Sequence, residues 1–333
     1  MKVSILVPVY GVEKYIERCA RSLFEQTYKD IEYIFVNDCS PDDSINVLQS
    51  VIRDYPVRTP NIRIINHKCN LGLAASRLTG LSHASGDYVM FMDSDDYLDL
   101  DGVEVLINKI LTTGCDIVSA GITHVFMNGL KYIDSPLKDD NKKDCLCLML
   151  ERKTMLNGVS RLYKKDLFDK LEDPFVKGLN FGEDYLMTSR IFYYAKSITY
   201  VDKPIYKYFH ENLESYTSQF KRHNFENLLE VDSMIYDFYH EKGEFEYLYH
   251  HQIGRLKLKA EQLILILRTK NVVKEDYNLL LSSFTEDQHF PKILKLPKQD
   301  FIILKLSEFM PLILMKVYVK LGYKIKQIVK RIK

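Results

Sequence analysis

The first hundred residues alternate between short apolar runs and segments with the spacing of amphipathic helices. The apolar runs are rich in β-branched and aromatic residues, as strands are, and they cover residues 3–7, 32–36, 62–65 and 88–92. The helical segments between them lie near residues 12–25, 41–54 and 71–83. Strands and helices that alternate in this way are typical of βαβ units. The sequence therefore predicts an α/β fold with a parallel, doubly wound sheet that is flanked by helices.

The second of these helices has a recognisable start. Ser40 is a favourable N-cap residue, and Pro41 suits the first helical position. Asp42 and Asp43 would place negative charge in the first turn, where the helix dipole favours it. We therefore expect this helix to begin directly after Ser40.

Polar segments follow each predicted strand, and in chain order they read PVYGVE, NDCSPDD, NHKCNLG and DSDD. The carboxyl ends of parallel strands meet at one edge of a doubly wound sheet, where ligands bind. The sequence has neither a GxGxxG motif nor a GxxxxGK[ST] motif, so a dinucleotide fold and a P-loop are not supported. A nucleotide at this edge would need another way to neutralise its phosphates.

The segment DSDD places three carboxylates within four positions, and neighbouring carboxylates repel unless a positive charge lies between them. Asp93 and Asp95 are two residues apart at a strand end, so both can point the same way and offer oxygen ligands to Mg²⁺ or Mn²⁺. Such a cation would bridge to a diphosphate. The alternative is a solvated turn, because Asp and Ser favour turns. Asp38, Asn70 and Arg77 are expected at the same edge and favour the metal site.

Composition excludes several other classes of protein. The formal net charge is +1 and 46% of the residues are hydrophobic, which is typical neither of a disordered chain nor of a nucleic-acid-binding protein. The six cysteines lack zinc-site spacing and indicate reduced thiols rather than a disulfide framework. No signal-peptide pattern is visible, and no uncharged apolar stretch reaches about 18 residues. We therefore expect a cytoplasmic protein with no membrane-spanning helix and no nucleic-acid partner.

Three segments together resemble the family 2 glycosyltransferases of the GT-A fold: residues 4–44, NLGLAASR (70–77) and ASGDYVMFMDSDDYL (84–98). The resemblance is strong over about residues 3–100 and extends more loosely to about residue 220. It implies a Rossmann-like, mixed and mostly parallel sheet with flanking helices and a C-terminal helical extension. The chain departs from the family pattern at four positions, where the family usually has Asn, Asp, Ala and Asn: Gly11, Asn37, Ser76 and Leu78.

The resemblance also implies roles for the residues at the sheet edge. Asp38 would accept a hydrogen bond from the base, most often uracil, and Arg77 would lie near the sugar or phosphate of the donor. Asp93 would face the ribose and the metal, and Asp95 would be the direct ligand of Mn²⁺ or Mg²⁺. The alternative for Arg77 is a structural salt bridge. The full predicted nucleotide site comprises Pro8, Tyr10, Glu13, Asp38, Asn70, Arg77, Asp93 and Ser94.

The pair Glu183–Asp184, in the segment NFGEDYLMTSR, supplies a candidate base. Sugar transfer needs a group that deprotonates the acceptor hydroxyl, and a carboxylate within hydrogen-bond reach can do so. In the family, the Asp of such a pair at a helix start is the base, which implies that Asp184 is catalytic and that Glu183 touches the acceptor. The alternative is an acid pair that stabilises the helix dipole. One base without a second catalytic carboxylate favours direct displacement with inversion.

Three basic residues complete the predicted site. The resemblance implies that His210, in YKYFHENLESYT, contacts the metal or the diphosphate, although a lone His is more often structural. The segment VSRLYKKDLF (159–168) resembles the part of these enzymes that borders the acceptor, which implies that Arg161 and Lys164 would meet an anionic acceptor. The alternative for these two is a general contribution to solubility.

Two other functions stay open on the sequence alone. A sugar-phosphate nucleotidyltransferase would carry a Gly-rich, Arg-containing loop after its first strand, and PVYGVEKYI is not such a loop. A non-catalytic, degenerate nucleotide-sugar-binding module is the second. Asp38, Asp93, Asp95 and Asp184 oppose it, because an inactive chain is free to lose carboxylates that repel one another.

The chain is expected to divide into three parts. Residues 1–220 would form the catalytic domain, with a nucleotide-binding half (1–100) and an acceptor half (101–220). Residues 221–290 read as helices that pack on the catalytic domain or on a sister subunit. Residues 291–333 carry eleven Lys and Arg residues against two acids, a net charge of +9.

The basic C-terminal segment has the pattern of an amphipathic helix. Its apolar face holds Val317, Leu321, Ile325, Ile328 and Ile332, and its polar face holds Lys316, Lys320, Lys324, Gln327 and Arg331. A helix of this kind is suited to an anionic membrane surface; the alternative is a dimerisation helix or a frayed end. The sequence thus predicts a glycosyltransferase at the inner membrane face. It would move a sugar from a nucleotide-sugar, such as a UDP-sugar, to a saccharide or lipid-linked acceptor of a surface polysaccharide.

Overall fold

The computed structural model describes residues 1–127, 129, 131–134, 141–210, 220–269, 273–284 and 304. The chain forms two compact units, one of residues 1–149 and 154–211 and the other of residues 150–153 and 212–333. The boundary predicted at residue 220 is close to this division, and the one predicted at residue 290 lies outside the described residues.

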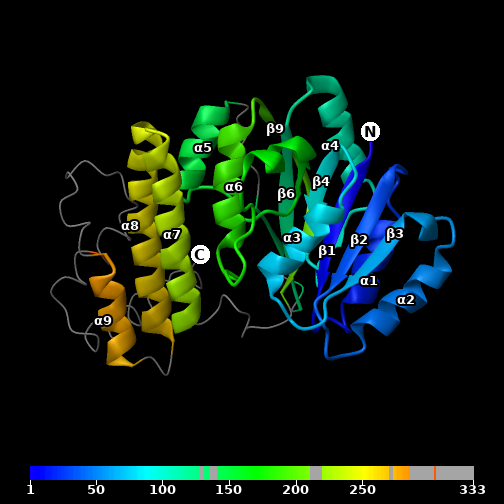
Figure 1. Cartoon of the computed structure of the whole chain (residues 1–333), viewed down its shortest axis with the longest axis horizontal. Helices are drawn as coiled ribbons and strands as arrows, with labels where there is room; N and C mark the ends of the chain where they lie inside the picture. The colour runs from blue at the N-terminus through cyan, green and yellow to red at the C-terminus, as the bar shows by residue number, and fades with distance from the viewer. Residues whose placement is uncertain are drawn as a thin grey trace, which may run out of the picture. The chain divides into compact units, whose positions relative to one another are not determined.

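The amino-terminal half of the first unit has the predicted strand–helix alternation. Parallel strands are arranged in the order β3 (Ile62–Asn66), β2 (Ile31–Asn37), β1 (Val3–Val9) and β4 (Tyr88–Phe91). The connections contain α1 (Ile16–Phe24), α2 (Ser44–Asp54), the 3-10 helix η1 (Thr59–Asn61) and α3 (Leu73–His83) (Figure 1). The prediction of a doubly wound parallel sheet is confirmed for this half.

Both faces of β2, β1 and β4 are buried, as their continuous apolar runs predict, whereas the edge strand β3 is only partly buried. Ile5 on β1 faces a core that also contains Leu23 of α1 and Leu48 of α2. The next residue, Leu6, points to the opposite face because side chains alternate along a strand. There α3 packs so closely that a Cβ added at Gly80 would lie 3.3 Å from the Cβ of Leu6. Because helices cover both faces, the open edge at the carboxyl ends of the strands is where polar side chains can gather.

Helix α2 begins at Ser44, so the prediction of a start after Ser40 was wrong. The side chain of Ser40 instead accepts a hydrogen bond from the backbone of Gly11 (2.9 Å) and donates one to Asp42 (2.6 Å). Asp42 also accepts from the backbone of Glu13 (3.0 Å). Burial alone would raise the pKa of Asp42, but these hydrogen bonds, with those from Ser44, lower it to about 2. The expected capping groups therefore tie the loop after β1 to the loop after β2.

The second half of this unit continues the sheet with mixed strand directions. The order after β4 is β8 (Arg161–Lys164), β6 (Ile117–Phe126), β9 (Ile198–His210) and β5 (Tyr97–Leu98), and β7 (Lys131–Asp134) pairs with β6. Only β6 and β9 are parallel to each other among these pairs. The helical segments are α4 (Gly102–Thr113), α5 (Lys142–Leu150), η2 (Lys165–Lys170) and α6 (Glu183–Tyr194). The mixed sheet that the resemblance implied is confirmed.

The second unit contains the expected C-terminal helices: α7 (Arg222–Glu241), α8 (Phe245–Arg268) and α9 (Lys274–Ser282). The turn between α7 and α8 contains Gly243, whose φ of +71° is accessible to glycine without strain. The predicted basic amphipathic helix lies outside the described residues. Within the described ranges, no helix has the length and apolar character needed to span a bilayer.

Candidate active site

The acidic turn after β4 is held in place by the last part of β9. The hydroxyl of Tyr206 donates to Asp96 (2.7 Å) and accepts from the backbone of Asp93 (3.2 Å). The backbone of Phe209 donates to the other oxygen of Asp96 (2.8 Å). Asp96 is buried, whereas Asp95 is exposed. The third carboxylate of DSDD therefore anchors the turn and leaves Asp93 and Asp95 at its surface.

Negative charge accumulates in this turn. Desolvation by the surrounding chain, followed by the charge of Asp93, raises the pKa of Asp95 to about 6, although the residue as a whole is exposed. Burial, followed by the negative charges of Asp95 and Asp93, raises the pKa of Asp96 well above its ordinary value. The guanidinium of Arg18 donates to the backbone oxygen of Asp95 (2.7 Å), and its positive charge partly opposes the rise in the pKa of Asp95. A turn of this kind favours the uptake of a proton or a cation.

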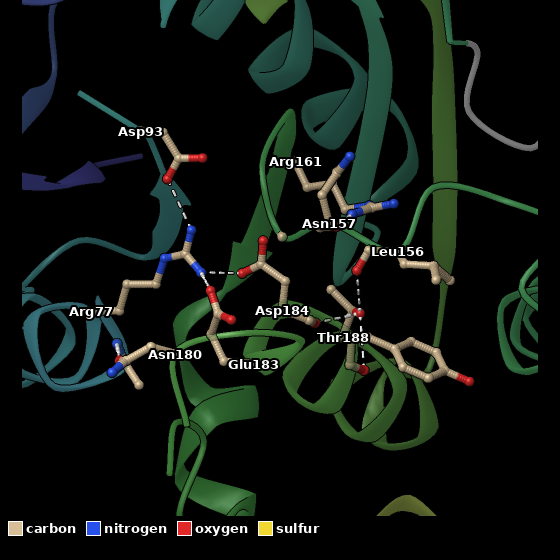
Figure 2. A network of polar contacts seen from close by, with 12 residues as sticks. Arg77, Asp93, Leu156, Asn157, Arg161, Asn180, Glu183, Asp184 and Thr188 are labelled. Carbon is tan, nitrogen blue, oxygen red and sulfur yellow. Dashed lines mark hydrogen bonds and ion pairs between the residues drawn. The ribbon is translucent and has the colours of Figure 1, made fainter. Parts of the chain in front are cut away.

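Arg77 joins the acidic turn to the start of α6 (Figure 2). Its side chain is 1% exposed, and one terminal nitrogen donates to Asp93 at 2.9 Å. The other terminal nitrogen donates to Glu183 at 2.7 Å and also to Asp184. A buried cation needs such compensation, because an unpaired charge in the interior is costly. Three carboxylates from two distant segments are therefore held around one guanidinium.

Glu183 and Asp184 occupy the first turn of α6, after Gly182 with a φ of +87°. Burial raises the pKa of both carboxyls, and the positive charge of Arg77 opposes the shift. The side chain of Asp184 is 20% exposed, against 7% for Glu183. A Cβ added at Gly158 would lie 3.0 Å from Asp184, so the loop before β8 closely confines this carboxylate. Asp184 is thus a fixed carboxylate of raised pKa that stays partly open.

Asp38 organises the loop that leads into α3. One of its oxygens accepts from the backbone of Leu71 and the other from the backbone of Gly72, both at 2.8 Å. The Nδ1 of His67 lies 2.7 Å from Asp38, and its Nε2 lies 2.9 Å from the hydroxyl of Thr79. Asp38 therefore fixes the start of the helix that carries Arg77. Its contact with a base stays a prediction.

The other predicted nucleotide residues follow the same strands. Tyr10, directly after β1, is 50% exposed, and Asn70 is also exposed. The carboxylate of Glu13 accepts from the backbone of Asp43 at 3.2 Å. Pro8 pairs with Val36 in the sheet, and Ser94 is buried in the acidic turn. Their contacts with a nucleotide stay predictions.

The two predicted acceptor residues, Arg161 and Lys164, lie at opposite ends of β8 and have different surroundings. Arg161 is buried, and its guanidinium donates to the backbone oxygens of Met155 (3.0 Å) and Asn157, so its visible role is to hold the loop before β8. Lys164 pairs with Tyr88, the first residue of β4, whereas the carboxylates follow the last residue of that strand. We therefore leave Lys164 out of the site. An acceptor contact by Arg161 stays a prediction.

His210, a predicted metal contact, lies at the end of β9. Its Nε2 is 2.9 Å from the Nδ1 of His124, and its ring stacks on that of Phe126 at 4.3 Å. No group of three metal-ligating side chains is found among the residues that the structure describes. Asp93 and Asp95 nevertheless fit a hard divalent cation, since Mg²⁺ is often bound through one or two carboxylates with the rest of its ligands from phosphate and water. The metal roles of all three residues stay predictions.

Two residues of the site were missed at the level of sequence. Asp96 was visible in DSDD but received no role, and Tyr206 lies 110 positions further along the chain. Nothing local marks Tyr206 as the partner of Asp96, because the contact depends on the pairing of β5 with β9. The anchor of the acidic turn could therefore be found only from the fold.

Comparison with known proteins identifies the family. The model of the family "Glycosyl transferase family 2" matches residues 4–172, so the chain belongs to that family. The glycosyltransferase GlyA of Streptococcus pneumoniae serotype 4 is 32% identical over 218 residues, which cover 62% of this chain and 30% of GlyA. The uncharacterized glycosyltransferase EpsJ of Bacillus subtilis is 33% identical over 221 residues, which cover 65% of this chain and 62% of EpsJ. The match thus spans less than two thirds of either relative.

Solved structures support the fold. Residues 1–349 of S. aureus TarS, in complex with UDP-GlcNAc, superpose with a TM-score of 0.66 at 20% identity, covering 97% of this chain and 92% of that one. The mannosyltransferase PcManGT from Pyrobaculum calidifontis, in complex with GDP-Man and Mn²⁺, gives a TM-score of 0.53 at 14% identity, with coverage of 95% and 86%. At these identities the likeness establishes the GT-A-type architecture alone.

Proposed function

We propose that this chain is an inverting glycosyltransferase, which moves a sugar from a nucleotide-sugar to a hydroxyl of a saccharide or lipid-linked acceptor. The observation that carries the proposal is the contact of Arg77 with both Asp93 and the pair Glu183–Asp184. It joins the strand end that would hold the donor to the helix start that would hold the base. Membership of family 2 over residues 4–172 supports the same reaction.

In this proposal, Asp184 is the general base. It accepts the proton of the acceptor hydroxyl as that oxygen forms a bond to the anomeric carbon and the bond from this carbon to the diphosphate breaks. The attack comes from the face opposite the leaving group, so the configuration inverts. Arg77 holds Asp184 in place, and its positive charge opposes the rise in the pKa of this carboxyl that burial causes.

Asp93 and Asp95 would hold the divalent cation, Mn²⁺ or Mg²⁺. When bound, the metal supplies Lewis-acid stabilisation of the charge that develops on the departing diphosphate. The complexes of TarS with UDP-GlcNAc and of PcManGT with GDP-Man and Mn²⁺ support a metal-assisted nucleotide-sugar donor, and the first favours a UDP-sugar.

A screen of nucleotide-sugars tests the proposal directly. The full chain is incubated with UDP-, GDP- and dTDP-sugars, with and without Mn²⁺ or Mg²⁺, and release of the free nucleotide is measured. At least one UDP-sugar should be hydrolysed only in the presence of metal. A chain that binds a donor without turnover would instead be a binding module. A parallel incubation with a nucleoside triphosphate and a sugar phosphate tests the other alternative, because release of pyrophosphate there would indicate a nucleotidyltransferase.

We further propose that the basic C-terminal segment attaches the protein to an anionic membrane, consistent with a lipid-linked acceptor. Deletion of residues 312–333 should weaken co-sedimentation with anionic vesicles, since each Lys or Arg near such a surface contributes on the order of 1 kcal/mol. Donor hydrolysis in solution should be retained, because every proposed donor contact precedes residue 211. High salt should partly mimic the deletion by screening the charges. Equal sedimentation with a changed mass in solution would favour a dimerisation segment instead.

A further inference from the structure

Five aromatic side chains lie on one face of three neighbouring strands in the first unit. They are Tyr132 on β7, His124 and Phe126 on β6, and Tyr208 and His210 on β9. The strand register places His124 between Tyr132 and Tyr208, and it pairs Phe126 with His210. Because alternate residues of a strand share a face, these rings form one continuous group. We call this group the ring strip.

The rings are packed against one another but remain open to water. The ring of Tyr132 lies nearly parallel to that of His124, with 4.2 Å between ring centroids and 9° between planes. Tyr132 is 53% exposed. His210 stacks on Phe126 at 4.3 Å and 4°. Cross-strand aromatic pairs also stabilise a sheet by roughly 0.2–1 kcal/mol each, which is the structural explanation. That explanation leaves open why the strip ends in a largely exposed tyrosine.

The inner end of the ring strip reaches the candidate active site. Tyr206, Tyr208 and His210 alternate along β9 and so follow one another on a single face. Tyr206, the first of them, donates its hydroxyl hydrogen bond to Asp96 of the acidic turn. Burial raises the pKa of Tyr208, and the next contributions come from the negative charges of Asp93, Asp96, Asp95 and Asp184. The strip therefore leads from the acidic turn, which Arg77 connects to Asp184, to the exposed ring of Tyr132.

We propose that the ring strip is the acceptor subsite and that it binds the C–H face of a pyranose ring. A pyranose with equatorial hydroxyls has an apolar face of C–H groups and a polar rim. Aromatic rings offer the matching apolar surface, and the Nε2 of His124 and the hydroxyl of Tyr132 can bond to the rim, whereas the Nδ1 of His124 already contacts His210. A sugar on the strip would extend toward Asp184, so this inference rests on the proposed function. The acceptor would then be bound by the aromatic residues of the strip in addition to the pair Glu183–Asp184.

A second copy of this chain is the other occupant to consider. Stable interfaces bury about 800 Å² on each partner, and their centres are depleted of charge. The hairpin that carries Tyr132 also exposes Lys131 and Asp134, and the other four rings of the strip are only partly exposed. A narrow row of rings beside a group of carboxylates fits a sugar better than a protein.

The absence of tryptophan from the sequence allows a direct test. Tyr132→Trp places a single indole on the exposed end of the ring strip. Tyr249→Trp, at a tyrosine of α8 that is 45% exposed, is the matched control in the second unit. Methyl β-glucopyranoside, cellotetraose and chitotetraose are titrated into each full-length variant without nucleotide. We expect a saturable change in emission for Tyr132→Trp with at least one probe, and none for Tyr249→Trp.

A second substitution tests the strip itself. His124→Ala in the Tyr132→Trp background removes the ring on which residue 132 stacks. The saccharide concentration that gives half of the emission change should therefore rise about three- to tenfold. Equal responses of Tyr132→Trp and Tyr249→Trp to the saccharides would overturn the proposal. Emission of Tyr132→Trp that changes with protein concentration but not with saccharide would also overturn it and would indicate self-association. The titration contains no donor, so failure of the nucleotide-sugar screen would not abolish its signal. The two proposals can therefore fail separately.

Discussion

Asp184→Asn is expected to lower sugar transfer by about 10²–10⁴-fold, the usual contribution of a general base, while the affinity for UDP stays nearly unchanged. The amide has the shape of the carboxylate, and its oxygen can still accept from Arg77, so the network around the guanidinium should persist. What is lost is the ability to take a proton from the acceptor hydroxyl. Single-turnover transfer and calorimetric titration with UDP and Mn²⁺ measure the two effects separately.

Glu183→Gln is the matched comparison, because the same change is made at the neighbouring carboxylate that also binds Arg77. Glu183 is less exposed than Asp184, so its substitution should reduce transfer by a smaller factor. Near-normal transfer by Asp184→Asn, together with a large loss in Glu183→Gln, would assign the base to Glu183 instead.

The pH dependence follows from the same burial. Desolvation raises the pKa of Asp184, and Arg77 only partly offsets this. The base acts in its ionised form, so wild-type transfer should fall as the pH decreases through this raised pKa. The fall should begin at a higher pH than an ordinary aspartate, with a pKa of about 3.9, would give. The residual transfer of Asp184→Asn should lack this acidic limb.

Much of the first unit could be predicted from sequence because its signals are local. Apolar runs such as residues 3–7 and 88–92 are buried on both faces, and their periodicity and flanking turns give the strands directly. The carboxyl-end rule then brings Asp38, Arg77 and Asp93 to one edge of the sheet. In the structure, Asp38 binds the backbone of the loop that leads to α3, and Arg77 on α3 binds Asp93.

The rest of the site depends on contacts between distant segments. Ser40 was a sound N-cap by propensity, but its hydroxyl is used by Gly11 on the neighbouring loop. Lys164 was placed through the resemblance of its segment, VSRLYKKDLF, to the part of the family that borders the acceptor. The antiparallel pairing of β8 with β4 instead carries it to the other end of that strand. The ring strip has no signature either, because its members come from three strands whose register is set by tertiary structure. Local sequence does not encode such pairings.

Asp95→Ala is expected to abolish metal-dependent nucleotide binding and transfer together. Substitution of groups that merely support a metal ligand typically costs 10–100-fold in affinity, so loss of a carboxylate that would itself hold the cation should cost at least about 10²-fold. The fold should survive, because the acidic turn is anchored through Asp96 and Tyr206 and because removing Asp95 relieves repulsion from Asp93. Circular dichroism and the melting temperature should therefore match or exceed those of the wild type.

The control for this substitution is Asp54→Ala, which removes an exposed carboxylate whose ion pair with Arg21 measures 2.9 Å. Surface pairs of this kind contribute little to stability, and α2 carries no proposed donor contact. UDP affinity is measured by calorimetry with and without Mn²⁺ for both variants. The wild type and Asp54→Ala should gain affinity on addition of Mn²⁺, whereas Asp95→Ala should not. If Asp95→Ala keeps the full gain, the cation is held elsewhere, and the pair Asp93–Asp95 only shapes the turn after β4.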